Sequence, residues 1–127
     1  MDKATMVNID ISRGSELIDI LERAKVKVSV ALWMFLSEYE DWRLVVSARH
    51  LDTLGTREAY RLLHDKLASA GFAIGKTPAI MILPMSDPFI KELRRIFAKA
   101  QSVEGMRLGG QMIGDRFVDD AYVYKIS

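Results

Sequence analysis

Three side chains with acid–base or charge-stabilising chemistry stand close together near the middle of the chain. Arg49, His50 and Asp52 follow the apolar segment "WRLVVSA". A histidine can take up and return a proton, and an arginine can stabilise the charge of a phosphorane, which is the chemistry of a metal-independent ribonuclease. Neighbouring residues of a strand point to opposite faces, so Arg49 and His50 meet only if the strand is bulged. The alternative interpretation is a strand whose polar end runs into solvent.

His64 is the second histidine of the chain and could complete an acid–base pair with His50. It follows Tyr60 by four positions, so both side chains lie on one side of a predicted helix, at the edge of its apolar stripe. The other interpretation is a histidine at the rim of the core.

Asp119 and Asp120 resemble a carboxylate pair for a metal ion, but the pleat of a strand separates them. If Gly114–Asp115 is a two-residue turn, Asp120 lies diagonal to Arg107 and can pair with it. Asp119 then lies opposite Gly110, on an apolar face. A carboxylate there requires either a functional role or a β-bulge at Gly109–Gly110 that lets it reach water. The apolar residues of that face are Leu108, Met112, Phe117 and Val123.

A predicted helix in "SDPFIKELRRIFAKA" carries four basic residues on its outer side. They are Lys91, Arg94, Arg95 and Lys99, with Glu92 nearby. Such a face would suit a phosphate backbone. No aromatic residues are interleaved with it and no nucleic-acid motif accompanies it, so an ordinary solvated helix is the competing interpretation.

The composition limits the remaining classes of site. The chain has 18 basic and 17 acidic residues, a net charge of +1, so no overall field draws it to nucleic acid or to a membrane, and any such attraction must be local. It has no cysteine, which excludes disulfides and thiolate ligands. Two histidines remain as soft ligands. Neither of the two functions considered below implies a cofactor, so we expect no cofactor and no metal. The start, "MDKATMVNIDIS", is unlike a signal peptide, so we expect a cytoplasmic protein.

Periodicity predicts one α+β domain over residues 1–127. Ser15 is the expected start of a helix over residues 16–25, and Thr56 and Asp87 or Ser86 are the expected caps of two later helices. Gly71 is expected to end the helix that begins at Thr56. The predicted strands are "VKVSVALWMFL", "WRLVVSARHL", "PAIMILP" and two segments of "MRLGGQMIGDRFVDDAYVYKI".

The order α-ββ-α-β-α-ββ favours a two-layer sandwich with a mainly antiparallel five-stranded sheet and three helices. Alternation places one set of apolar side chains of the first strand on one face of the sheet. This set is Val26, Val28, Val30, Leu32, Met34 and Leu36. The buried side of the last helix is predicted to be Phe89, Leu93, Ile96 and Phe97.

Three aromatic residues suggest a surface for a partner. Trp33 and Phe35 lie on the second face of the first strand, and Trp42 begins the next strand. Three short helices would not cover both faces of five strands, so we expect a homodimer formed through the sheet. The alternative is a monomer in which the N-terminal "MVNIDI" covers this face.

The chain resembles a family of small uncharacterised bacterial proteins. The resemblance rests on "ALWMF", "EDWRLVVSA", a glycine shortly before "REAY", and the closing "DDAYVYKI". It implies a cytoplasmic α+β domain and assigns no activity to any residue.

Two functions follow from the sequence. The first is a non-enzymatic interaction or accessory module that acts through a face or an edge of its sheet, with a protein partner or a second copy. The second is a small ribonuclease or RNA-binding effector built on Arg49, His50, Asp52 and the basic helix. An enzyme requires a histidine to converge with Arg49 or a carboxylate in one concave site.

Overall fold

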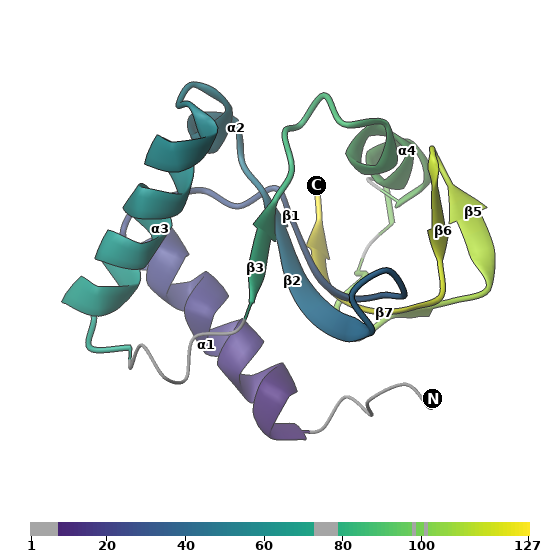
Figure 1. The fold of residues 1–127 in the computed structure, drawn as a ribbon, viewed down its shortest axis with the longest axis horizontal. Coiled ribbons are helices and arrows are strands. Elements are labelled where there is room, and N and C mark those ends of the chain that lie inside the picture. Colours follow the sequence, from purple (N-terminus) through teal and green to yellow (C-terminus); the bar gives the residue numbers. More distant parts are fainter. Residues whose placement is uncertain (1–7, 73–78, 98, 101) are drawn as a thin grey trace.

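The computed structural model describes residues 8–72, 79–97, 99–100 and 102–127, which form four helices and seven strands (Figure 1). The helices are α1 (Asn8–Arg23), α2 (Arg49–Asp52), α3 (Thr56–Ser69) and α4 (Pro88–Phe97). The strands are β1 (Val30–Leu36), β2 (Asp41–Ser47), β3 (Ile80–Ile82), β4 (Arg107–Leu108), β5 (Gln111–Ile113), β6 (Arg116–Val118) and β7 (Asp120–Ile126). The α+β class is confirmed, with α2 as a helix that the sequence did not predict.

Five strands form one mixed sheet in the order β3-β2-β1-β7-β4. β1 pairs antiparallel with β2 and with β7, and β7 pairs antiparallel with β4. β3 lies parallel to β2, because the chain crosses back through α2 and α3 between these two strands. The β1–β2 hairpin predicted from the sequence is confirmed, with Phe35 opposite Trp42.

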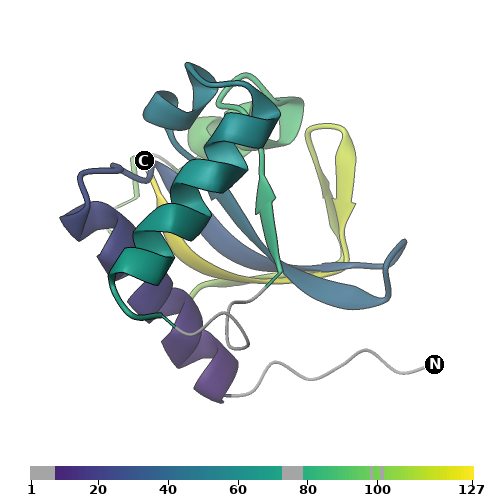
Figure 2. The same cartoon turned by 60° about the vertical axis from the view of Figure 1, so that its left-hand side comes forward.

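Both faces of the sheet are covered, so the two-layer prediction is wrong. α1 and α3 cover one face, and α4 together with the β5–β6 hairpin covers the other (Figures 1 and 2). Val30, Leu32 and Met34 face the α4 side, whereas Ala31 and Trp33 face the α1 side. The third layer arises because part of the last hairpin leaves the sheet and folds over it.

α1 begins at Asn8, upstream of the predicted start, so Ser15 lies inside the helix and does not cap it. Its close approach to the sheet depends on Gly14, where a Cβ would clash with the Tyr124 hydroxyl oxygen and lie 2.8 Å from Trp33 Nε1. Trp33 Nε1 donates a hydrogen bond of 2.9 Å to Tyr124, whose hydroxyl donates one of 2.5 Å to the carbonyl of Ile11. This chain of hydrogen bonds joins β1, β7 and α1.

The strand predicted to begin at Val26 begins four residues later, at Val30. Lys25 has a φ of +67°, and the connection from α1 turns Val26 and Val28 toward the helices. Both side chains therefore pack on the α1 side, and the prediction that they share the face of Val30 is wrong.

The last hairpin bends sharply between its two halves. Its turn at Gly114–Asp115 is confirmed. The β5–β6 and β4–β7 pairs follow one register, so no residue is inserted, and the β-bulge considered as one of two alternatives is absent from this hairpin. A Cβ at Gly109 would lie 2.9 Å from the carbonyl oxygen of Asp119, and Gly110 has a φ of +67°. The bend reverses the face that points inward: Leu108, Ile113, Val118 and Val123 are all buried.

Met112 and Phe117 consequently point outward, although a flat hairpin would have placed them beside Leu108 and Val123. They lie opposite each other across β5 and β6, with 63% and 58% of their surface exposed. Asp119 lies half-buried next to the bend.

Candidate functional site

Arg49, His50 and Asp52 form a single helical turn, not the end of a strand. β2 ends at Ser47, Ala48 is the extended residue before the helix, and α2 spans Arg49–Asp52. The argument that Arg49 and His50 point to opposite faces of a strand is therefore wrong. Both side chains are exposed.

The Asp52 carboxylate has a structural partner. Its two oxygens lie 3.3 and 3.1 Å from the backbone nitrogen of Met85, which donates to them. The buried hydroxyl of Ser47 donates to the Met85 sulfur over 3.1 Å. Through these hydrogen bonds, Asp52 of α2 and Ser47 of β2 hold Met85, which belongs to the segment that follows β3.

A small pocket lies next to these hydrogen bonds, beyond the carboxyl ends of the parallel strands β2 and β3. Such ends are where ligands bind in open α/β sheets. The pocket holds about 140 Å³. Its lining consists of Leu51, Asp52, Leu54, Thr56, Ala59, Tyr60, Ile82 and Pro84. Its wall is both apolar and polar, with the Asp52 carboxylate and the hydroxyls of Thr56 and Tyr60 as polar groups.

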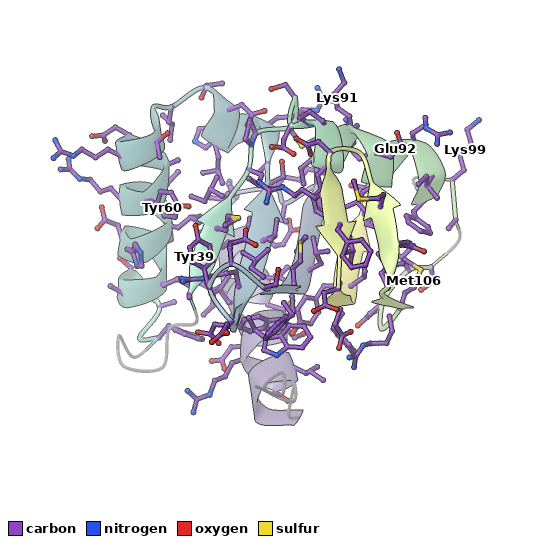
Figure 3. The ribbon with its side chains drawn as sticks, turned by 45° about the vertical axis from the view of Figure 1, so that its right-hand side comes forward. Tyr39, Tyr60, Lys91, Glu92, Lys99 and Met106 are labelled. Atoms are coloured by element: carbon purple, nitrogen blue, oxygen red, sulfur yellow. The ribbon has the colours of Figure 1, made fainter. Side chains whose placement is uncertain are left out.

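β3 is an edge strand of the sheet and borders this pocket. Its three side chains, Ile80, Met81 and Ile82, are half-buried. The backbone amide of Ile82 points away from β2 and donates to the Tyr60 hydroxyl over 2.9 Å. Alternate residues of a strand present their N–H and C=O groups to the same side, so Ile80 also points its backbone groups outward. Figure 3 labels Tyr60 on α3.

The two histidines lie on different helices. His50 lies on α2, and His64 is an exposed residue of α3, whose buried stripe is Ala59, Leu63 and Leu67. Among the described residues, no hydrogen bond or ion pair joins any two of Arg49, His50, Asp52 and His64. The ribonuclease hypothesis stays a prediction.

The aromatic residues predicted to bind a partner are inside the molecule. Trp33, Phe35 and Trp42 are only 4%, 6% and 7% exposed and belong to the core beneath α1 and α3. Phe35 and Trp42 meet edge to face, with ring centroids 5.7 Å apart. These residues stabilise the fold and are not a partner surface, so the predicted dimer through this face loses its basis.

α4 ends at Phe97, so Lys99 lies just beyond it, and two of the four basic residues predicted for this helix are already engaged. Arg95 forms an ion pair with Glu92, and the hydrogen bond to Glu92 raises the pKa of the Arg95 guanidinium. Arg94 Nε donates to the backbone oxygen of Ser127 over 2.8 Å. Lys91 and Lys99 reach into solvent (Figure 3). Asp87 caps this helix as predicted, by accepting the Phe89 amide over 2.9 Å.

The predicted pair across the last hairpin is confirmed, since Arg107 Nη2 lies 2.9 Å from Asp120 Oδ1. In the part of the chain that the structure describes, His, Asp and Glu side chains form no cluster of three that could hold a metal ion. Nor does any helix within the described ranges have the length and apolarity to cross a membrane.

Comparisons with known proteins identify no relative of this chain. It matches no family model, no curated protein and no solved structure. The resemblance to a bacterial family therefore stays a prediction.

The sequence did not single out the residues that border the pocket and the open edge. Tyr60 was noted only as a neighbour of His64, and the edge strand only as a short apolar segment between prolines. The signal was present in "PAIMILP", because prolines at both ends of a short strand are typical of a sheet edge.

Proposed function

We propose that this chain is an interaction module that binds an extended segment of a partner protein along the outer edge of β3. The segment would add a strand to the sheet and place one side chain in the pocket beside Tyr60. The observation that carries the proposal is the juxtaposition of the β3 edge and the pocket, which share Ile82. Strand addition supplies backbone hydrogen bonds, and pockets for side chains supply specificity.

The size of the pocket favours a side chain over a free substrate. Sites for small molecules and cofactors hold about 300–1,000 Å³. The volume here is about 140 Å³, and apolar cavities of that order hold a group the size of benzene. An aliphatic or aromatic side chain of a bound strand fits this space.

The Tyr60 hydroxyl occupies the place that a partner's carbonyl group would take. It accepts the outward amide of Ile82 while the edge is empty. Natural sheets protect their edges against unwanted pairing. Binding would exchange the hydroxyl for a backbone carbonyl, so Tyr60 acts as a cap of the edge in the free protein.

A library of displayed random linear peptides tests the proposal. We expect the selected peptides to lose about tenfold or more in affinity for Ile80→Pro, because proline removes the outward N–H and places a ring on the pairing side. Edge strands tolerate proline where the N–H faces solvent, and circular dichroism verifies the fold. Ile80→Val is the matched control, since it keeps the amide and the β-branched shape and should bind like the wild type.

The pocket is tested separately with Ala59→Leu, which adds three carbon atoms to its wall. We expect this variant to lose binding of peptides whose anchoring side chain is large. Selected peptides that bind folded Ile80→Pro as tightly as the wild type would contradict the proposal. Cleavage of mixed RNA by the wild type that disappears in His50→Ala would contradict it as well, in favour of the ribonuclease.

A further inference from the structure

The outer surface of α4 and of the β5–β6 hairpin combines exposed apolar side chains with cations. We infer that this surface, which we call the hairpin–α4 surface, binds the anionic face of a lipid bilayer from the outside. It is defined by Met112, Phe117, Ile96, Lys91 and Lys99. The inference does not depend on the β3 edge.

The hairpin and α4 lie side by side in one layer on the same face of the sheet, and each has an outward side that is exposed to solvent. A Cβ at Gly114 in the hairpin turn would lie 2.6 Å from the backbone oxygen of Pro88, the first residue of α4. Both elements bury their other sides in the same core cluster, with Ile113 and Val118 from the hairpin and Leu93 from the helix. The turn of the hairpin therefore meets the first residue of α4, and the exposed sides of both elements lie outward from this shared core.

The apolar part of this surface is well exposed. Phe117 and Met112 are 58% and 63% exposed, and Ile96 on α4 is 45% exposed, contrary to its predicted place in the core. The only other large apolar side chain exposed to this degree among the described residues is Tyr39, in the β1–β2 turn. Apolar side chains of this kind insert at the boundary between headgroups and acyl chains.

The charge of α4 and the residues just after it has the sign that anionic lipids attract. Four basic residues and one acidic residue lie between Pro88 and Lys99. Glu92 is paired with Arg95, and the Asp87 carboxylate is held by the Phe89 amide. Lys91 and Lys99 are exposed, and Figure 3 shows both reaching away from the helix. The nearly neutral charge of the whole chain conceals this local excess of positive charge.

A lipid surface fits these observations better than a second copy of the chain. A stable protein interface buries about 800 Å² on each partner, whereas membrane association requires only a few inserted side chains and nearby cations. A second copy that met this surface with α4 on the two-fold axis would also bring one basic helix against another. A nucleic acid would use the lysines, but it gives no role to Met112 and Ile96.

The test is co-sedimentation with vesicles of phosphatidylcholine alone and with vesicles of phosphatidylcholine and phosphatidylserine in equal parts. We expect binding to the mixed vesicles only, weakening as salt is added. Lys91→Ala with Lys99→Ala should lower the partition coefficient about thirtyfold, at about fivefold for each lysine. Phe117→Ser should lower it about tenfold or more. Lys27→Ala, at an exposed lysine outside α4, and Tyr39→Ser are the matched controls and should bind like the wild type.

Equal binding to both kinds of vesicle, or binding to neither, would overturn the inference. So would mixed-vesicle binding that survives both the double lysine variant and Phe117→Ser. Light scattering tests for a second copy of the chain, and binding of a single-stranded RNA homopolymer tests for a nucleic acid. If the protein binds no vesicles and forms a dimer that Phe117→Ser dissociates, the surface binds a second copy instead. If it binds no vesicles and binds RNA through the lysines but not through Phe117, the surface binds nucleic acid instead.

Discussion

On the face of the sheet that carries Trp33, two helices of 16 and 14 residues form the cover, whereas on the face that carries Met34 a helix of 10 residues shares the cover with a small hairpin. The helices close their face without exposing a large apolar side chain from α1 or α3 among the described residues. The hairpin closes its face only by bending at Gly109, and it leaves Met112 and Phe117 outside. The helix-covered face therefore serves stability alone, whereas the cover of the other face also exposes apolar side chains that a partner could contact.

Shortening a core side chain on the helix-covered face should have the largest effect on stability. Leu21 is fully buried in α1, and Leu21→Ala should lower the free energy of unfolding by about 2–5 kcal/mol, because it leaves a cavity between helix and sheet. Urea titration measures this change. Ser12→Ala, at an exposed position of the same helix, should change it by less than about 0.5 kcal/mol. A loss below about 1 kcal/mol for Leu21→Ala would show that the helix is not closely packed there.

The next effect concerns the contact that holds the hairpin against α4. Gly114 has a φ of +62°, and a Cβ there would meet the backbone of Pro88. Gly114→Ala should therefore lower the free energy of unfolding by about 2–3 kcal/mol, from left-handed strain and crowding together. Gly71→Ala is the control, because Gly71 has a φ of +79° with nothing within 4 Å of the added carbon. It should cost only about 1–2 kcal/mol. Equal losses of unfolding free energy in the two variants would mean that the backbone of Pro88 moves aside at little cost.

Removing the Tyr60 hydroxyl should change stability and binding in opposite directions. Tyr60→Phe loses the hydrogen bond from Ile82 and should lower the free energy of unfolding by about 0.5–1.5 kcal/mol. Because the edge amide is then free, the affinity for a selected peptide should rise about two- to tenfold, as measured by calorimetry. Tyr39→Phe, at an exposed tyrosine of the β1–β2 turn, should alter neither quantity. A fall in affinity for Tyr60→Phe would mean that the hydroxyl contacts the partner directly.

The smallest effect on stability is expected at the outward side of the hairpin. Phe117→Ser should change the free energy of unfolding by less than about 0.5 kcal/mol, since the ring is mostly in solvent. Thermal unfolding followed by circular dichroism measures it. A loss comparable to that of Leu21→Ala would show that Phe117 belongs to the core, and the contrast between the two faces would disappear.

Local patterns predicted the elements whose determinants lie close together in the sequence. The β1–β2 hairpin, the Gly114–Asp115 turn, the Asp87 cap and the Arg107–Asp120 pair were all predicted from spacing and residue type. Each depends on residues within one helix end or one hairpin. Gly71, at the end of α3, follows the same rule, with the positive φ that ends a helix.

The features that the sequence did not predict depend on contacts between distant segments. α2 forms where Asp52 meets the amide of Met85, 33 positions away, and nothing in "ARHLD" indicates that partner. The parallel placement of β3 follows from the crossover through α2 and α3, and the pocket that β3 borders lies beside this contact. The third layer depends on the bend at Gly109, which reverses the inward face of a hairpin whose alternation predicts a flat ribbon. The candidate site therefore became visible only in three dimensions.

The central claim is that a partner strand pairs with the outer edge of β3, and amide hydrogen exchange of Ile80 tests it most directly. In the free protein this amide points outward, and we expect it to exchange quickly. On saturation with a selected peptide, the Ile80 amide should become protected, while the Met81 amide, which faces β2, should change little. An Ile80 amide that exchanges equally fast with and without bound peptide would contradict strand addition at this edge.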